Sequence, residues 1–219
     1  MPVRTRKSTL AIAAAVTVGM PLAITAPAFS HGYTTNPPSR SSLCANGTVK
    51  NCGPIQWEPQ SVEGPKGFPQ SGPGDGRICA AGDSRWAPLD DPRGGAWPAK
   101  SVSAGAFTFT WRLTAVHATT SFRYFITRDG WNPSQPLTRA ALESQPFLQK
   151  TYGGQRPPST VSHPGTLPSK SGRHLILAVW DIADTANAFY SCADVTFGGA
   201  TTAAAPAPQR RPGYSVLFA

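Results

Sequence analysis

The stretch His174-Leu175-Ile176-Leu177-Ala178-Val179-Trp180 is almost entirely apolar and has the length of one β-strand. A continuous apolar run of this length is typical of a strand that is buried on both faces. Residues 107–113 and 122–127 alternate apolar and polar side chains, and so do residues 189–197. Such alternation indicates strands with one buried face. The run at 174–180 is therefore predicted to be a central strand of a β-sandwich.

The segment from residue 36 to residue 100 is very different, because it is rich in Pro, Gly and Ser and has almost no periodicity. Loops of this length are uncommon and are usually either functional or disordered. This one carries several large aromatic residues, and we therefore predict an ordered functional loop inserted between the first strands. Only residues 138–143 have helical character. The fold class predicted is all-β, an immunoglobulin-like or fibronectin-type sandwich. The aromatic residues of the loop are Trp57, Phe68, Trp86 and Trp97.

The two ends of the chain are predicted to lie outside this domain. Residues 1–30 combine three basic residues, an apolar run at 10–24 and the small-residue pattern Ala28-Phe29-Ser30, which is typical of a secretory signal peptide. The apolar run is shorter than the roughly 20 residues that span a bilayer, so a membrane anchor is disfavoured. Residues 200–219 are predicted to be a low-complexity disordered tail. We expect a secreted, extracellular, monomeric protein whose domain covers residues 31–199.

The net charge of +9 is concentrated at these ends. Three positive charges lie before residue 31 and two more follow residue 199, which leaves +4 for the domain. The domain contains no block of Lys and Arg, so nucleic acid is not an expected partner. A membrane is not an expected partner either.

The cysteines are Cys44, Cys52, Cys79 and Cys192. An even number in an exported chain indicates two disulfides, and the spacings lack the close pairs of a zinc site. Three pairings are possible. We favour Cys44–Cys52, which closes a short loop, and Cys79–Cys192, which closes a loop of about a hundred residues and stabilises by roughly 4–5 kcal/mol in the chain-entropy model.

The sequence lacks the usual motifs of hydrolases: there is no Gly-x-Ser-x-Gly, no His-Glu-x-x-His, and no two acids that stand out as a glycosidase pair. Cleavage after Ser30 would instead make His31 the first residue. A terminal His offers two metal ligands, its α-amine and an imidazole nitrogen, and the amine loses its proton at modest cost. A second imidazole would give a three-nitrogen set, and nitrogen-rich tetragonal sites suit Cu(II).

Three other histidines can supply that imidazole. His174 lies inside the apolar run and is expected to be a hydrogen-bonded core residue. His163 precedes a proline in a turn-rich segment, where the plain interpretation is a solvated surface side chain. His117 lies between two strand patterns, and the loop ends of a rigid sandwich are where sites are built. We prefer His117 as the second ligand.

Taken together, several motifs show that residues 31 to about 197 resemble the bacterial lytic polysaccharide monooxygenases of auxiliary activity family 10, especially small chitin-active members. No single motif would be specific alone. They are His31-Gly32-Tyr33, residues 58–64, Leu113-Thr114-Ala115-Val116-His117, residues 124–127, residues 134–139 and residues 179–190.

The resemblance implies a copper centre with one ion per chain. His31 and His117 match the two arms of the family's copper brace, and Phe189 matches the aromatic residue on one axial side of the metal. Ala115 matches the small residue near the other axial side, where bulk would obstruct oxygen or water. Glu63 matches an acid beside the metal that can hydrogen-bond or donate a proton to oxygen there.

The resemblance also implies a flat substrate-binding face. Trp57 stands where many members have Tyr and keeps a ring that can stack on a sugar. The plain alternative is that Trp57 is buried within the loop. A Cys44–Cys52 disulfide resembles a common family pair, whereas Cys79–Cys192 corresponds to a variant of some members only. The matching positions of the face are Trp57, Glu58, Thr114, Asp184 and Asn187.

The implied activity is oxidative cleavage of glycosidic bonds in crystalline chitin, with C1 oxidation as the family expectation. Copper would be reduced by an external electron donor, and dioxygen or hydrogen peroxide would supply the oxygen. Three alternatives remain at this point: a chitin-binding protein without catalysis, a copper carrier, and an enzyme that acts on cellulose. A carrier would not explain the aromatic-bearing loop.

Overall fold

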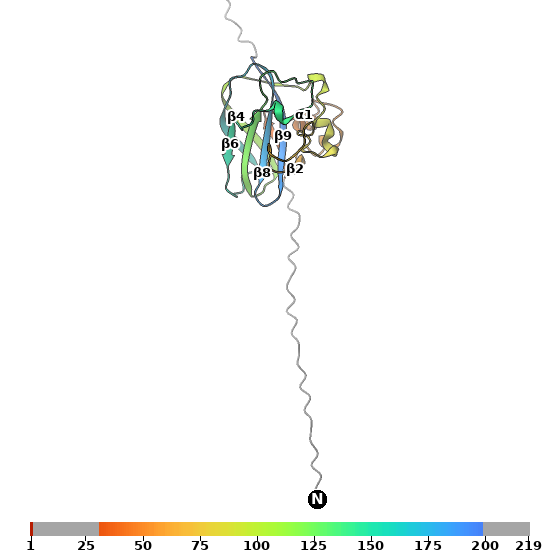
Figure 1. Cartoon of the computed structure of the whole chain (residues 1–219), viewed down its shortest axis with the longest axis vertical. Helices are drawn as coiled ribbons and strands as arrows, with labels where there is room; N and C mark the ends of the chain where they lie inside the picture. The colour runs from red at the N-terminus through yellow and green to blue at the C-terminus, as the bar shows by residue number, and fades with distance from the viewer. Residues whose placement is uncertain (2–30, 199–219) are drawn as a thin grey trace, which may run out of the picture.

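The computed structural model describes Met1 and residues 31–198 (Figure 1). The rest of the predicted signal peptide and the predicted tail at 200–219 lie outside the described residues. No helix of the described part is long and apolar enough to cross a membrane. The strands are β1 (His31–Asn36), β2 (Glu63–Pro65), β3 (Lys100–Val102), β4 (Gly105–Ala115), β5 (Thr119–Ile126), β6 (Leu148–Thr151), β7 (Thr160–Leu167), β8 (Gly172–Ile182) and β9 (Asn187–Phe197).

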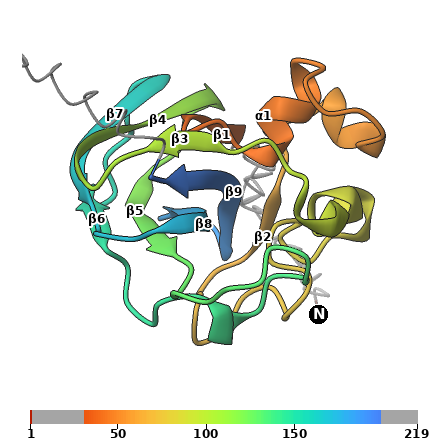
Figure 2. The same ribbon diagram turned by 90° about the horizontal axis from the view of Figure 1, so that it is seen from above.

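The strands form two sheets that face each other, as Figure 2 shows from above. One sheet has three strands in the order β1-β4-β7, and the other has six, in the order β2-β9-β8-β5-β6 with β3 paired to β9. The pairings are antiparallel except for β3 with β9. This arrangement is the predicted β-sandwich.

The strand that decides the fold is β8, which lies between β9 and β5 in the larger sheet. Its residues from His174 to Ile182 are all buried, as predicted for a central strand. The aromatic rings of the core gather around its Trp180, which stacks on Phe122 with an interplanar angle of 5° and packs edge-on against Trp111. Because these rings come from β4, β5 and β8, one cluster joins the two sheets.

The segment between β1 and β4 is ordered but more structured than predicted. It contains the α-helix α1 (Arg40–Ala45), the 3₁₀ turns η1 (Gly53–Gln56), η2 (Ser84–Leu89) and η3 (Arg93–Gly95), and the short strands β2 and β3. The helix was not predicted because it is a single short element fixed by a cap: the Ser39 side chain accepts a hydrogen bond from Ser42 N. The predicted helical segment at 138–143 is only the 3₁₀ turn η4 (Arg139–Ala141).

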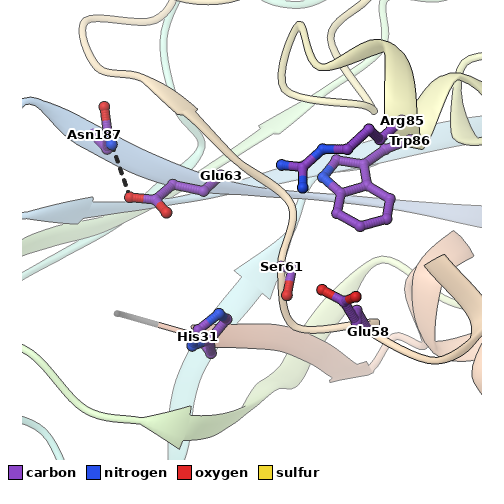
Figure 3. A pocket seen from close by; sticks show the side chains of 7 residues that line it. All are labelled: His31, Glu58, Ser61, Glu63, Arg85, Trp86 and Asn187. Carbon is purple, nitrogen blue, oxygen red and sulfur yellow. Dashed lines mark hydrogen bonds between the residues drawn. The ribbon is translucent and has the colours of Figure 1, made fainter. Parts of the chain in front are cut away.

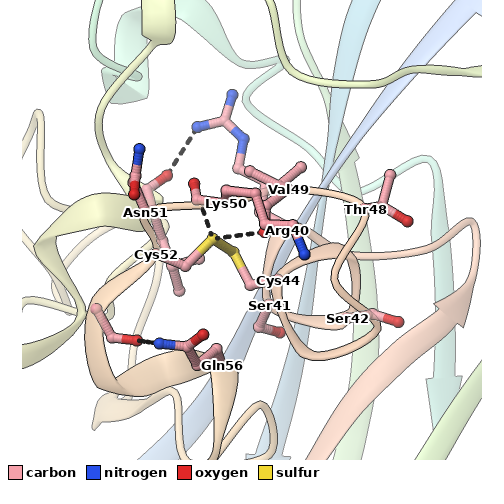
Figure 4. Close-up of a disulfide and its surroundings, with 12 residues drawn as sticks. Arg40, Ser41, Ser42, Cys44, Thr48, Val49, Lys50, Asn51, Cys52 and Gln56 are labelled. Atoms are coloured by element: carbon pink, nitrogen blue, oxygen red, sulfur yellow. Dashed lines mark hydrogen bonds between the residues drawn. A yellow bond between two sulfur atoms is a disulfide. The ribbon is translucent and has the colours of Figure 1, made fainter.

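Both favoured disulfides form, and all four cysteines are paired. Cys44–Cys52 closes the loop between α1 and η1 (Figure 4). Cys79–Cys192 ties the long segment to β9 across a sequence separation of 113 residues. Beside it, the buried Arg40 guanidinium donates to Asp194 on β9 (2.8 Å) and to the Leu89 carbonyl of η2 (2.8 Å). The long segment is therefore attached to the sandwich covalently and by a buried ion pair.

Candidate metal centre

His31 is the first residue of β1 and lies against the end of β4, where it pairs with Ala115. The pairing is irregular between His31 and Gly32. A Cβ on Gly32 would lie 2.6 Å from Leu113 Cδ2 and 3.1 Å from the Trp180 ring, so only glycine fits this approach of β1 to the core. Gly32 N also donates to the Gln60 carbonyl (3.0 Å), which brings the His31 end of β1 beside the long segment.

His117 lies in the turn between β4 and β5, two residues beyond Ala115, as predicted. Its side chain is buried, and its Nδ1 is 3.3 Å from Asp184 Oδ1. A carboxylate beside one ring nitrogen orients the imidazole and leaves the other nitrogen, Nε2, available to bind a metal. Asp184, assigned to the substrate face from the sequence, therefore also contacts a proposed metal ligand.

The other two histidines are core residues. The expectation of a loop position for His163 is wrong: it lies in β7, where its ring nitrogens contact the hydroxyls of Tyr124 (2.6 Å) and Tyr152 (3.1 Å). Its burial lowers the pKa of His163 to about 4, so this side chain is neutral at neutral pH. The prediction for His174 is confirmed, because this buried ring contacts the Thr127 hydroxyl at 3.0 Å.

Phe189 forms an apolar wall on one side of His31. It is fully buried in β9, its ring centroid lies 6.4 Å from that of His31, and it packs at 5.2 Å against Trp180. A ring in this position offers no ligand atom to a metal held by His31. Phe189 is thus both a core residue and a neighbour of His31.

Glu63 begins β2 and pairs with Phe189 of β9. Asn187 Nδ2 donates to Glu63 Oε1 at 2.8 Å, which fixes the carboxylate. The next residue, Gly64, has no room for a side chain because the Ala81 carbonyl occupies the place of a Cβ. The close approach of residue 81 thus holds β2, and with it Glu63, against β9.

Glu63 and Asn187 border a pocket of about 280 Å³ beside His31 (Figure 3). Three of the lining residues were not assigned from the sequence, namely Ser61, Arg85 and Trp86. Nothing in the sequence pattern predicts that Arg85 or Trp86 lines a pocket beside His31, because their position depends on how the long segment folds. Ser61 falls inside the 58–64 motif but was not singled out. The full lining is His31, Glu58, Ser61, Glu63, Arg85, Trp86 and Asn187.

Arg85 and Trp86 both come from η2 and have contrasting environments. The Arg85 guanidinium donates from Nε (2.9 Å) and Nη2 (2.7 Å) to Asp83 Oδ2, and its carbon lies 4.9 Å from the centroid of the Trp86 ring. Hydrogen bonding from Arg85 lowers the pKa of the Asp83 carboxyl, and the pair raises the pKa of Arg85. Trp86 is 2% exposed, and its Nε1 is buried with no hydrogen-bond partner among the described residues.

The structure places the predicted substrate-face residues at the surface. Trp57 follows η1 and is 78% exposed, which rules out the alternative that its ring is buried within the loop. Glu58 and Thr114 are exposed as well, and Asp184 is 44% exposed at its side chain. Asn187 is half-buried because it bonds Glu63. Glu58 lines the pocket beside His31, so the surface next to Trp57 reaches the candidate metal centre.

The donors considered for a metal here are the imidazoles of His31 and His117 and the amine that cleavage after Ser30 would free. Within the part of the chain that the structure describes, no group of three or more His, Cys, Asp or Glu side chains can hold a metal ion. A site formed by two imidazoles and a terminal amine has only two side-chain ligands, so this finding does not test the His31 and His117 set. Three nitrogen donors without a thiolate suit Cu(II).

Comparison with known proteins decides the family. The sequence model of the family described as "Lytic polysaccharide mono-oxygenase, cellulose-degrading" matches residues 31–195. The chain belongs to this family. Lytic polysaccharide monooxygenases of this type are copper-dependent enzymes that cleave polysaccharides oxidatively, and they are generally secreted. The match begins at His31.

Curated relatives agree with this assignment. The chain is 48% identical over 174 residues to AA10 family lytic polysaccharide monooxygenase C of Mycosarcoma maydis, which covers 78% of this chain and 53% of that protein. It is 43% identical over 198 residues to GlcNAc-binding protein A of Shewanella oneidensis, which covers 90% of this chain and 41% of that protein. The chain thus spans about half the length of these relatives or less.

Solved structures of monooxygenases share the fold. An AA10 lytic polysaccharide monooxygenase from Streptomyces lividans is 58% identical with a TM-score of 0.75, over 76% of this chain and 100% of that one. A Bacillus amyloliquefaciens CBM33 protein in complex with Cu(I) is 38% identical with a TM-score of 0.71, over 76% of this chain and 99% of that one. The predicted immunoglobulin-like sandwich is confirmed.

Proposed function

We propose that this protein is a secreted lytic polysaccharide monooxygenase that oxidises crystalline chitin at C1. One copper ion is held by the amine and imidazole of His31 and by Nε2 of His117, once cleavage after Ser30 has freed the amine. An external electron donor and either dioxygen or hydrogen peroxide are the co-substrates. The observation that carries the choice of chitin is the chemistry of the pocket beside His31.

That pocket presents both hydrogen-bond donors and hydrogen-bond acceptors. The Arg85 guanidinium is a donor, whereas the carboxylates of Glu58 and Glu63 are acceptors. The acetamido group of N-acetylglucosamine has one carbonyl acceptor and one N–H donor, so it can satisfy both kinds of partner. A glucose hydroxyl at the same position is smaller and fills less of the 280 Å³. The pocket therefore favours chitin over cellulose.

When bound, copper supplies the redox chemistry that activates the oxygen co-substrate for attack on a C–H bond at the glycosidic linkage. The chain's own residues set the conditions for that chemistry. His117 is oriented by Asp184, with Nδ1 and Oδ1 3.3 Å apart. Phe189 excludes water and ligand atoms from one side of His31, whereas the small side chain of Ala115, paired with His31, leaves space on the other.

Glu63 is the residue that can hold a proton beside the metal centre. Its Oε1 accepts the Asn187 amide at 2.8 Å, so Oε2 is the oxygen available to carry a proton. In Figure 3 this second oxygen lies on the side of the carboxylate nearer His31. A carboxyl group in this place can deliver a proton to oxygen at the pocket or accept one from it.

The exposed face supports binding to a solid substrate. Trp57, exposed on the surface, can stack on a sugar ring, and Glu58, Thr114 and Asp184 are exposed polar residues. A surface of this kind meets a polymer chain in place and does not require the chain to be lifted into a cleft. The name GlcNAc-binding protein A of the Shewanella relative supports the same sugar.

Cellulose is the second candidate substrate, because the matching family is described as cellulose-degrading. Mass spectrometry of products from chitin and from cellulose, with copper and a reductant, separates the candidates. We expect chitin oligosaccharides oxidised at C1 and little or no product from cellulose. Oxidised products from cellulose alone would overturn the choice of substrate. Chitin binding without any oxidised product would favour a non-catalytic binding protein.

A further inference from the structure

We propose that Arg85 is a specificity-determining residue that disfavours deacetylated, positively charged glucosamine units in the pocket beside His31. This inference rests on the proposed function, because it concerns which sugars of a chitin-type polymer the pocket accepts. Chitin is commonly mixed with deacetylated units, which carry an ammonium group where N-acetylglucosamine carries a neutral acetamide. Discrimination between the two often needs a repulsive element as well as an attractive one.

The Arg85 side chain is exposed, yet its position is fixed. It is 69% exposed, but Nε and Nη2 both bond Asp83 Oδ2, and the guanidinium packs on the Trp86 ring. Asp83 is itself held, because its Oδ1 caps η2 by accepting from Arg85 N at 2.9 Å. Among the described residues, Nη1 has no hydrogen-bond partner. Arg85 therefore presents a permanent positive charge and a donor to the pocket that it lines (Figure 3).

The other charged side chains at or beside this pocket are carboxylates, whose attraction for cations Arg85 weakens. Glu58 and Glu63 line the pocket, and Asp83 lies directly behind Arg85. Glu58 is close enough to favour the charged form of Arg85 electrostatically. Three carboxylates without an arginine would form a site that attracts cations. The guanidinium offsets part of that attraction, so Arg85 repels a glucosamine ammonium but does not repel a neutral acetamide.

Trp86 forms a wall of the pocket beside Arg85. Its side chain lines the pocket and is almost fully buried, and its indole N–H is buried as well. A charged ammonium group loses hydration when it is placed against a buried wall, whereas the corresponding cost for a neutral acetamide is smaller. The wall formed by η2 therefore adds to the preference set by the charge of Arg85.

The test is to measure binding isotherms of the metal-free protein on chitin and on highly deacetylated chitosan at low salt. The Arg85→Gln variant should bind chitosan more tightly relative to chitin, by about threefold to tenfold, because a permanent charge is lost at an exposed site. Arg85→Lys keeps the charge and should retain most of the wild-type preference. High salt should shrink the difference between wild type and Arg85→Gln. With copper and a reductant, oxidised products from partly acetylated chains should shift in the same direction.

Lys100→Gln is the matched control, because it removes the same charge from an exposed residue that pairs with Val195, towards the other end of β9 from Asn187. It should leave the chitin-to-chitosan ratio unchanged. The proposal is overturned if Arg85→Gln leaves the ratio unchanged or if Lys100→Gln shifts it equally. If wild type forms no oxidised product, the proposed function fails, while the isotherms still decide the role of Arg85.

Discussion

The sandwich and the segment between β1 and β4 contribute to the same site in different ways. The sandwich holds His31, His117 and Phe189 on strands or at a tight strand connection, packed on the aromatic core around Trp180. The long segment brings Glu58, Glu63 and η2 to that site through a cap, two disulfides and a buried Arg40–Asp194 pair. The proposed metal ligands are thus placed by the sandwich, whereas the residues proposed to select substrate are placed by specific tethers.

Loss of a metal ligand from the rigid sandwich should have the strongest consequence. His117→Ala should lower copper affinity by roughly a hundredfold or more, because outer partners of metal ligands alone are worth about 10–100-fold. Asp184→Asn should lower copper affinity by about 10–100-fold, since it removes the carboxylate beside His117 Nδ1. Calorimetric copper titration measures both.

His163→Ala is the control for this assignment. It should destabilise the fold, because it removes the partner of two tyrosine hydroxyls, but a folded sample should still bind copper. If His163→Ala lost the metal while His117→Ala kept it, the second ligand would be misassigned.

Among the effects on stability, removal of a disulfide from the long segment should be the largest. Replacing Cys79 and Cys192 by Ser should lower the free energy of unfolding by about 5 kcal/mol in the chain-entropy model, against about 2.6 kcal/mol for the Cys44 and Cys52 pair. Urea unfolding of both double variants measures the difference. Equal losses would mean that loop length does not govern the stabilisation, and that the buried ion pair holds the segment without the disulfide.

Two variants of the long segment should separate chemistry from binding. Glu63→Gln keeps the shape of the side chain and removes its proton-carrying carboxyl, so oxidised products should fall while chitin binding changes little. Trp57→Ala removes an exposed ring and should weaken chitin binding by about one to two powers of ten, with copper affinity near wild type.

Chitin isotherms, copper titrations and product analysis of both variants test this separation. Full turnover by Glu63→Gln would contradict the assignment of Glu63 as a proton carrier. It would not contradict the assignment of His31 and His117 as metal ligands. Normal chitin binding by Trp57→Ala would show that the binding face is misplaced.

The two regions should also differ, more weakly, in how their stability depends on pH. In the sandwich, burial lowers the pKa of His163 to about 4, so the unfolded chain binds more protons between pH 4 and 6.5 and stability falls as pH falls. In the long segment, burial raises the pKa of Asp90 from 3.8 to about 6. The folded state then binds more protons between these values, and stability falls as pH rises through that window.

The two contributions oppose each other between about pH 4 and 6. Asp90→Asn should therefore make the melting temperature fall more steeply on acidification across this window, because the His163 contribution is no longer offset. Thermal melts at several pH values measure the slope. An unchanged slope would show that Asp90 titrates near its ordinary value in the folded protein.

The sequence predicted the sandwich well and the long segment poorly, for a physical reason. Apolar periodicity reports burial, so β4, β5, β8 and β9 were recognisable, and His117 could be placed between two of them. The strand β7 escaped notice because Pro164 and the buried polar His163 interrupt its pattern. Arg85 and Trp86 were missed because the position of η2 depends on the Cys79–Cys192 bond and the Arg40 contacts, which join residues far apart in the chain.

The proposed metal centre depends above all on the free amine of His31. Copper affinity should therefore be compared between two forms of the protein, one that begins at His31 with a free amine and one in which that amine is acetylated. We expect tight binding for the first form and a loss of roughly a hundredfold or more for the second, because an amide nitrogen replaces the amine while both imidazoles remain. Equal affinity of the two forms would contradict the assignment of the amine as a copper ligand.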